Sequence, residues 1–206
     1  MKVNFKVMAN NSDQETNLIW DKVQNIDFFE KFNYLLSLPD HIIVTNLIKR
    51  VKLNTQSKSD YSDLFNLIKT EIYDIADYRN GINNIYLHLK NVNLSFGCFQ
   101  NYNKLWNFKY FDEYRILLTL YGPGGEYSPS SGEIIMLTTK NGEFRRSSNP
   151  LETIIHEMVH IGIEECIIQK FDIPHKVKEQ IVDYLCCFIL IMCFQIITYK
   201  ILRVIK

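Results

Sequence analysis

The chain has 206 residues, of which 47% are hydrophobic and 22% are charged, and its formal net charge at pH 7 is zero. This length and composition predict one ordinary globular domain with a sizeable core. The balanced charge gives no indication of a nucleic-acid partner. The five cysteines fit neither a disulfide framework nor a cysteine zinc site, and the N-terminus lacks a secretory signal, so we expect a cytoplasmic protein.

The first half of the chain is predicted to be mostly helical. Apolar residues at alternating or helical spacing predict a strand over Val3–Met8 and helices over Thr16–Tyr34, after Pro39, over Tyr61–Tyr78 and over Ile82–Trp106. Gly81 is expected to break or bend the helical run. The chain contains no internal repeat.

Two strands are predicted in the second half. Glu113–Tyr121 ends in a continuous apolar run typical of a buried strand, and Gly132–Thr139 is the second strand. Between them the segment Gly122–Gly125, with three glycines and a proline, predicts a loop. We expect the two strands to pair antiparallel through this long connection.

The sequence His-Glu-Met-Val-His at positions 156–160 has the H-E-x-x-H spacing of zinc-binding helices. Residues four apart on a helix share a face and lie roughly 6 Å apart, so His156 and His160 can reach one tetrahedral zinc ion. Glu157 can take a proton from water at the open position of the metal, whose pKa zinc lowers to about 7.

The motif falls on a predicted helix, as this chemistry requires. Asn149 suits the N-cap, Pro150 the first helical position and Glu152 the third. The residues from Leu151 to Ile168 then have helical apolar spacing. A second helix is predicted to begin at Pro174.

A catalytic zinc site needs a third protein ligand. On the second helix His175, Glu179 and Asp183 are spaced four apart and share one face. Glu164 is one rival for the third ligand, although three ligands spread over eight residues of a straight helix would rise about 12 Å. His175 is the other rival, or it contacts substrate or transition state instead.

H-E-x-x-H followed by 18 residues and then Glu179 resembles the gluzincins, which include thermolysin-like and aminopeptidase-type zinc peptidases. In thermolysin-like members an Asp four residues after the ligand Glu hydrogen-bonds the first zinc histidine, and Glu179 and Asp183 resemble that pair. The resemblance covers about a quarter of the chain, from Gly132 to Asp183. It implies one Zn²⁺ per chain held by His156, His160 and Glu179, with Asp183 orienting His156.

The same resemblance implies a strand that binds substrate. In gluzincins an edge strand before the zinc helix pairs with an extended peptide, and here Gly132, Ile134 and Met136 would lie on it. A plain core strand is the alternative. The Tyr-Gly-Pro-Gly-Gly and His-Glu-Met-Val-His segments are also similar to those of an uncharacterised bacterial family.

Gluzincins stabilise the oxyanion with a tyrosine or histidine besides the metal. The candidates in this chain are Tyr121, Tyr127, Tyr184 and His175. We favour Tyr127, because it lies in the loop before the predicted cleft strand.

The C-terminal region is strongly apolar from Tyr184 to Phe194. The window from Ile181 to Tyr199 is nearly long enough to span a bilayer, but it contains Asp183 and Gln195. Continuous apolarity also describes a helix buried on all sides, which we expect here, and a membrane tail is the alternative.

These observations predict an α+β fold in one domain, with a mostly helical part over residues 1–110 and a zincin-like part over residues 111–206. The zincin-like part combines a small antiparallel sheet with two helices that carry the metal ligands. The predicted function is a zinc metallopeptidase that acts on a peptide or protein, with Glu157 as general base. The alternative is a non-enzymatic, zinc-stabilised module that binds peptides or regulates a partner.

Overall fold

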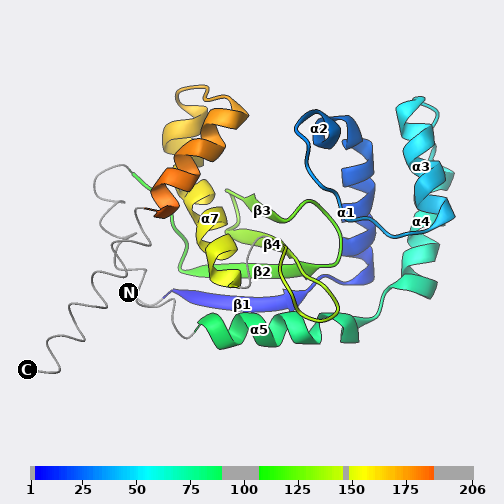
Figure 1. Ribbon diagram of the computed structural model, residues 1–206, viewed down its shortest axis with the longest axis horizontal. Helices are drawn as coiled ribbons and strands as arrows, with labels where there is room; N and C mark the ends of the chain where they lie inside the picture. Colours follow the sequence, from blue (N-terminus) through cyan, green and yellow to red (C-terminus); the bar gives the residue numbers. More distant parts are fainter. Residues whose placement is uncertain (1–2, 90–106, 146–148, 188–206) are drawn as a thin grey trace, which may run out of the picture.

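The computed structural model describes residues 3–89, 107–145 and 149–187 (Figure 1). Its four strands form one sheet in the order β1-β2-β4-β3. The strands are β1 (Asn4–Ala9), β2 (Glu113–Thr119), β3 (Gly125–Ser128) and β4 (Glu133–Leu137). The predicted α+β class is confirmed, and so is the strand near the N-terminus.

The sheet is mixed, because β1, β2 and β4 are parallel and β3 is antiparallel. The predicted antiparallel pairing of β2 with β4 is therefore wrong. The reason is β3, which lies within their connection and pairs with β4 on the side away from β2. After β2 the chain runs beyond the place of β4 and forms β3, which is antiparallel to β2. It then reverses and forms β4, which is parallel to β2 and lies between β2 and β3. Gly122 and Gly124 lie in the segment between β2 and β3, and their φ angles of 113° and 152° are in the region that favours glycine.

Helices pack around the sheet in two groups. They are α1 (Ser12–Gln24), α2 (Ile26–Lys31), α3 (Ile42–Lys52), α4 (Lys58–Leu67), α5 (Arg79–Leu89) and α7 (Pro150–Ile163), with short turns η1 (Ile68–Ile72), η2 (Ile75–Tyr78) and η4 (Glu164–Gln169). Residues 175–187 form a further helix after α7. The helices α1, α3 and α4 lie together beside the sheet, whereas α5 packs against β1 and α7 against β3 and β4 (Figure 1).

The prediction that the first half is mostly helical is confirmed, but the helices are interrupted at other positions than predicted. The helical run of α4 and η1 ends at Tyr73, whose backbone is extended with ψ of 120°. Gly81 does not break a helix, because it lies inside α5. A Cβ at Gly81 would lie 2.8 Å from Thr138 Oγ1, so close packing on the sheet accounts for this glycine. The helix predicted beyond Leu89 falls on residues 90–106, outside the described residues.

Two apolar cores support these groups of helices. The larger core joins the sheet to α5 and α7 and includes Ile116 and Val159. The second core lies among α1, α3 and α4 and includes Ile19 and Leu64. A cavity is lined by residues from both halves of the chain.

The predicted apolar run at the C-terminus falls mainly on residues 188–206, which lie outside the described residues. Within the ranges that the structure describes, no helix has both the length and the apolar character needed to cross a membrane.

Candidate metal centre

The two histidines of the motif lie on one face of α7. Asn149 caps this helix by accepting a hydrogen bond from the Leu151 backbone N–H at 3.1 Å, and Pro150 is the first helical residue. One turn apart, His156 Nε2 and His160 Nε2 are 3.1 Å from each other. The local sequence therefore sets the two imidazoles side by side.

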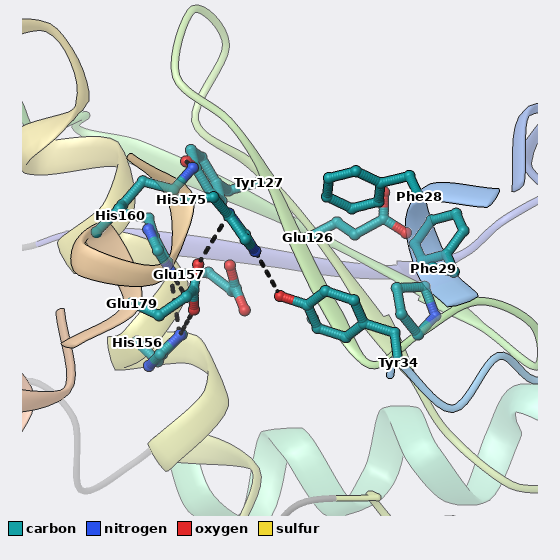
Figure 2. A pocket seen from close by; sticks show the side chains of 13 residues that line it. Phe28, Phe29, Tyr34, Glu126, Tyr127, His156, Glu157, His160, His175 and Glu179 are labelled. Carbon is teal, nitrogen blue, oxygen red and sulfur yellow. Dashed lines mark hydrogen bonds and ion pairs between the residues drawn. The ribbon is translucent and has the colours of Figure 1, made fainter. Parts of the chain in front are cut away.

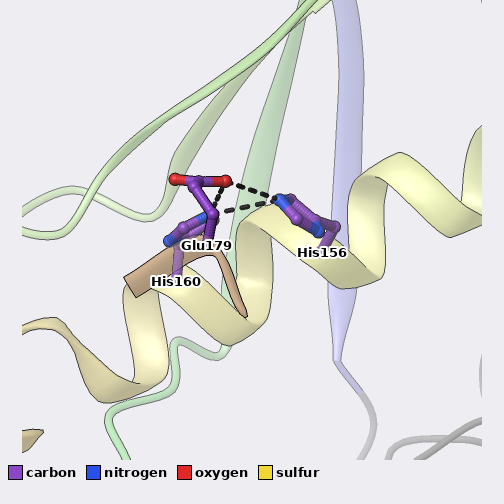
Figure 3. A group of neighbouring side chains, drawn as sticks. All are labelled: His156, His160 and Glu179. Atoms are coloured by element: carbon purple, nitrogen blue, oxygen red, sulfur yellow. Dashed lines mark hydrogen bonds and ion pairs between the residues drawn. The ribbon is translucent and has the colours of Figure 1, made fainter. Parts of the chain in front are cut away.

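A third side chain joins them from the helix formed by residues 175–187 (Figure 3). Glu179 Oε2 is 3.6 Å from His156 Nε2 and 3.5 Å from His160 Nε2. Ligands bonded to one tetrahedral metal ion at about 2.0–2.1 Å lie about 3.4 Å apart, and the three observed separations match this value. His156, His160 and Glu179 could therefore hold a metal ion.

The electrostatics of the group suit metal binding. Burial lowers the pKa of His160, and the Glu179 carboxylate only partly opposes this shift. Burial acts to raise the pKa of Glu179, but hydrogen bonds and charge interactions with the two histidines outweigh it and hold that pKa below its usual range. A neutral imidazole and an ionised carboxylate are the forms that bind metal ions.

The two histidines differ in their outer neighbours. Asp183 Oδ1 lies 3.5 Å from His156 Nδ1, so Asp183 occupies the position that the resemblance implied. His160 Nδ1 is buried and has no hydrogen-bond partner among the described residues. The His160 ring instead lies against the ring of Tyr127.

The three side chains open into a cavity of about 260 Å³ (Figure 2). Glu157, only 3% exposed, lines the same cavity. Its carboxylate packs against the β3 backbone at Gly125, where an added Cβ would lie 2.9 Å from Glu157 Cδ. The predicted general base and the predicted ligands therefore face one space.

The opposite wall of the cavity comes from the N-terminal half, which the sequence did not connect with the site. Phe28, Phe29 and Tyr34 line it from α2 and the segment that follows (Figure 2). The Tyr34 hydroxyl oxygen is 2.8 Å from His175 Nε2, so this wall is linked to the second ligand helix. The only signal in the sequence is a cluster of aromatic residues, and it does not indicate which distant segment they face.

Tyr127 lines the cavity, but its hydroxyl is not placed for the predicted oxyanion role. It donates a hydrogen bond to Glu164 Oε2 at 2.7 Å and accepts one from Lys178 Nζ at 3.0 Å. Burial and the neighbouring Glu164 raise the pKa of Tyr127 above its ordinary value, so the hydroxyl stays protonated. Its two hydrogen bonds leave it fixed within the wall.

The remaining candidates differ in position. Glu164 and His175 lie outside the group of three ligand atoms, although His175 Nδ1 is 3.8 Å from Glu179 Oε1. Among the oxyanion candidates, Tyr121 and Tyr184 are not part of the cavity lining, whereas His175 is. His175 therefore lines the cavity as an oxyanion candidate, and Tyr34, which is hydrogen-bonded to it, also lines the cavity.

The strand predicted to bind substrate is an interior strand. β4 pairs with β2 on one side and with β3 on the other, so it has no free edge. Ile134 and Met136 are 0% and 1% exposed, and Gly132 forms the turn before β4 with φ of 66°. These three residues therefore do not form the predicted substrate-binding edge. The edge strand on the side of the cavity is β3, whose Gly125 and Glu126 line the cavity.

Comparison of the chain with protein-family models, with curated proteins and with solved structures found no match. The resemblance to gluzincins stays a prediction from the motif and its spacing.

Proposed function

We propose that this protein is a zinc-dependent metallopeptidase of the gluzincin type, with one zinc ion per chain. The observation that carries the proposal is the convergence of His156, His160 and Glu179, with Glu157 lining the same cavity. Three protein ligands leave a fourth position open, as in catalytic rather than structural zinc sites. Nitrogen and oxygen ligands at tetrahedral spacing suit zinc.

A zinc ion held here would polarise a substrate carbonyl and lower the pKa of water to about 7. Glu157 takes the proton from the attacking water and delivers it to the leaving amine. Tyr34 lies on the wall opposite the ligands and is hydrogen-bonded to His175 of the second ligand helix. In the tautomer whose Nε2–H donates to the Tyr34 oxygen, His175 orients the Tyr34 hydroxyl, which donates a hydrogen bond to the oxygen that gains negative charge. Water activation and charge stabilisation therefore come from opposite walls of the cavity.

A peptide or protein is the substrate class that the cavity walls suit. β3 lies at the edge of the sheet and its residues Gly125–Tyr127 line the cavity. An extended peptide can add to such an edge through backbone hydrogen bonds. Across the cavity, Phe28 and Tyr34 present aromatic rings that suit a large apolar side chain.

The test compares the wild type with Glu157→Gln and Glu179→Ala, for zinc content and for cleavage of a mixed peptide library by mass spectrometry. We expect one zinc per chain in the wild type and in Glu157→Gln, with cleavage by Glu157→Gln lower by about 10²–10⁴-fold because the general base is lost. Glu179→Ala should lose both zinc and cleavage. Undiminished cleavage by Glu157→Gln would reject the mechanism. Zinc binding by a wild type that cleaves no peptide would favour the non-enzymatic module.

A further inference from the structure

The two histidines of the metal centre are held by different kinds of neighbour. His156 has Asp183, whose Oδ1 is 3.5 Å from His156 Nδ1. His160 Nδ1 is buried without a hydrogen-bond partner among the residues that the structure describes. A ligand histidine almost always donates its second ring N–H to a carboxylate, carbonyl or water, and this fixes the orientation of the ring. The His160 ring must be held by another contact.

Tyr127 supplies a contact of the right geometry. The centroids of the Tyr127 and His160 rings are 4.7 Å apart and the ring planes differ by only 8°. Tyr127 belongs to β3, and its hydroxyl is hydrogen-bonded to Glu164 at 2.7 Å and Lys178 at 3.0 Å. Lys178 Nζ also lies 5.5 Å from the centroid of the ring. The tyrosine ring is thus anchored at its backbone and at its hydroxyl.

We infer that Tyr127 is a positioning residue, which fixes the metal-binding orientation of His160 by ring stacking instead of by a hydrogen bond. A parallel ring that cannot move prevents the imidazole from turning about its Cβ–Cγ bond, because rotation would drive the ring edge into Tyr127. The stack does for His160 what Asp183 does for His156. The inference rests on the metal centre of the proposed function, and it holds whatever reaction that centre catalyses.

Three variants test this role through metal affinity. Tyr127→Leu removes the ring, whereas Tyr127→Phe keeps the ring and removes only the hydroxyl. Tyr61→Leu is the matched control, because Tyr61 also has a hydroxyl hydrogen bond, to Asn17 at 2.7 Å, and a ring contact, with Trp20, but does not line the cavity. Zinc affinity is measured by competition with a chromophoric chelator. The visible absorption of the cobalt-loaded protein reports ligand geometry, and thermal unfolding of the metal-free protein reports stability.

Tyr127→Leu should lower zinc affinity by about 10–100-fold, the usual effect of losing an outer neighbour of a ligand histidine, and should alter the cobalt spectrum. Tyr127→Phe should retain most of the affinity and the wild-type spectrum. Tyr61→Leu should leave both unchanged, even where it lowers the unfolding temperature. This pattern separates positioning of His160 from a general effect on stability.

Wild-type affinity and spectrum in Tyr127→Leu would overturn the inference. An equal loss in Tyr127→Phe and Tyr127→Leu would also overturn it, because the hydroxyl rather than the ring would then be responsible. A wild type that binds neither zinc nor cobalt would reject the inference and the metal centre together. A protein with the expected affinities that cleaves no peptide would support the inference and refute the peptidase.

Discussion

Gly125 limits where the Glu157 carboxylate can lie. A Cβ at this position would overlap Glu157 Oε1 and would lie 2.9 Å from Glu157 Cδ and 3.0 Å from Thr153 Cγ2. Gly125 does not have a positive φ, so the restriction comes from contact and not from backbone conformation. The absence of a side chain lets β3 approach α7 and confines the proposed general base between them.

Gly125→Ala should therefore lower peptide cleavage by about 10²-fold, because the added methyl group displaces the Glu157 carboxylate from the position in which it accepts the proton of the attacking water. Zinc content should stay at the wild-type level, since Gly125 contacts the base and not the ligand group. Ser130→Ala, an exposed change in the turn after β3, is the control for an effect on the strand. Wild-type cleavage by Gly125→Ala would show that the position of Glu157 is not critical.

The second wall of the cavity, formed by α2 and the segment after it, is anchored to the rest of the protein. Ser37 and Gly122 exchange two backbone hydrogen bonds, at 2.9 Å and 2.8 Å. The Arg145 guanidinium donates hydrogen bonds to the backbone carbonyls of Leu35 and Pro123. These contacts hold the aromatic rings of the wall in place before a substrate arrives, which lowers the cost of binding.

Phe28→Ala should raise the KM for peptides with phenylalanine or leucine beside the scissile bond by about tenfold, because a large apolar contact is lost. The kcat should change little, since the ring binds substrate and transition state alike. Phe171→Ala is the matched control, because Phe171 is 64% exposed, compared with 43% for Phe28, and does not line the cavity. A KM that rises equally for peptides with small side chains would contradict this role.

The end of α7 is packed closely against Phe108. The Lys109 backbone N–H donates to the Gly162 carbonyl at 3.0 Å, and a Cβ on Gly162 would overlap the Phe108 ring. Gly162→Ala should lower the free energy of unfolding by about 1–3 kcal/mol through this overlap. In an open helix the same change would raise it by up to about 1 kcal/mol. Urea unfolding of the wild type and Gly162→Ala gives the sign of the change in free energy of unfolding. A variant that is more stable than the wild type would contradict the close packing of Phe108 on Gly162.

At the scale of the whole molecule, the helical group is joined to the sheet by buried polar contacts of α1. Glu15, which is fully buried, accepts hydrogen bonds from the Tyr78 hydroxyl at 2.6 Å and the Thr119 hydroxyl at 2.7 Å. Lys22 Nζ lies 2.6 Å from Glu126 Oε2 on β3, beside the cavity. The two cores are thus coupled through α1, and the cavity depends on both.

Burial raises the pKa of Glu15, and the hydrogen bonds from Tyr78 and Thr119 only partly oppose this. Because the folded-state pKa lies above the unfolded value, the contribution of Glu15 to stability is greatest below the unfolded pKa and is lost as pH rises through the folded pKa. Glu15→Gln removes this titration while keeping a side chain of the same size. The difference in free energy of unfolding, variant minus wild type, should therefore increase from pH 4 to pH 8.

Urea unfolding of the wild type and Glu15→Gln across this pH range measures the difference, so that contributions from other carboxylates cancel. A difference that stays constant with pH would show that Glu15 has an ordinary pKa. A difference that falls with pH would show that the carboxylate is stabilised in its ionised form.

The ligand helices were predictable because helix formation and side-chain spacing depend on nearby residues. Asn149 and Pro150 define the start of α7, and a four-residue spacing places His156 beside His160 whatever the rest of the chain does. The same spacing puts Glu179 and Asp183 on one face of the second helix. The sequence alone therefore determined which side chains each helix could offer to a metal ion.

Only the tertiary structure decided the direction and order of the strands, because strand pairing joins residues far apart in the chain. It placed β3, and not β4, at the sheet edge beside the cavity, and it turned the Tyr127 hydroxyl toward Glu164. It also brought Phe28 and Tyr34 across from the ligands. None of these contacts leaves a periodic or local pattern, because each depends on how separate elements pack against one another.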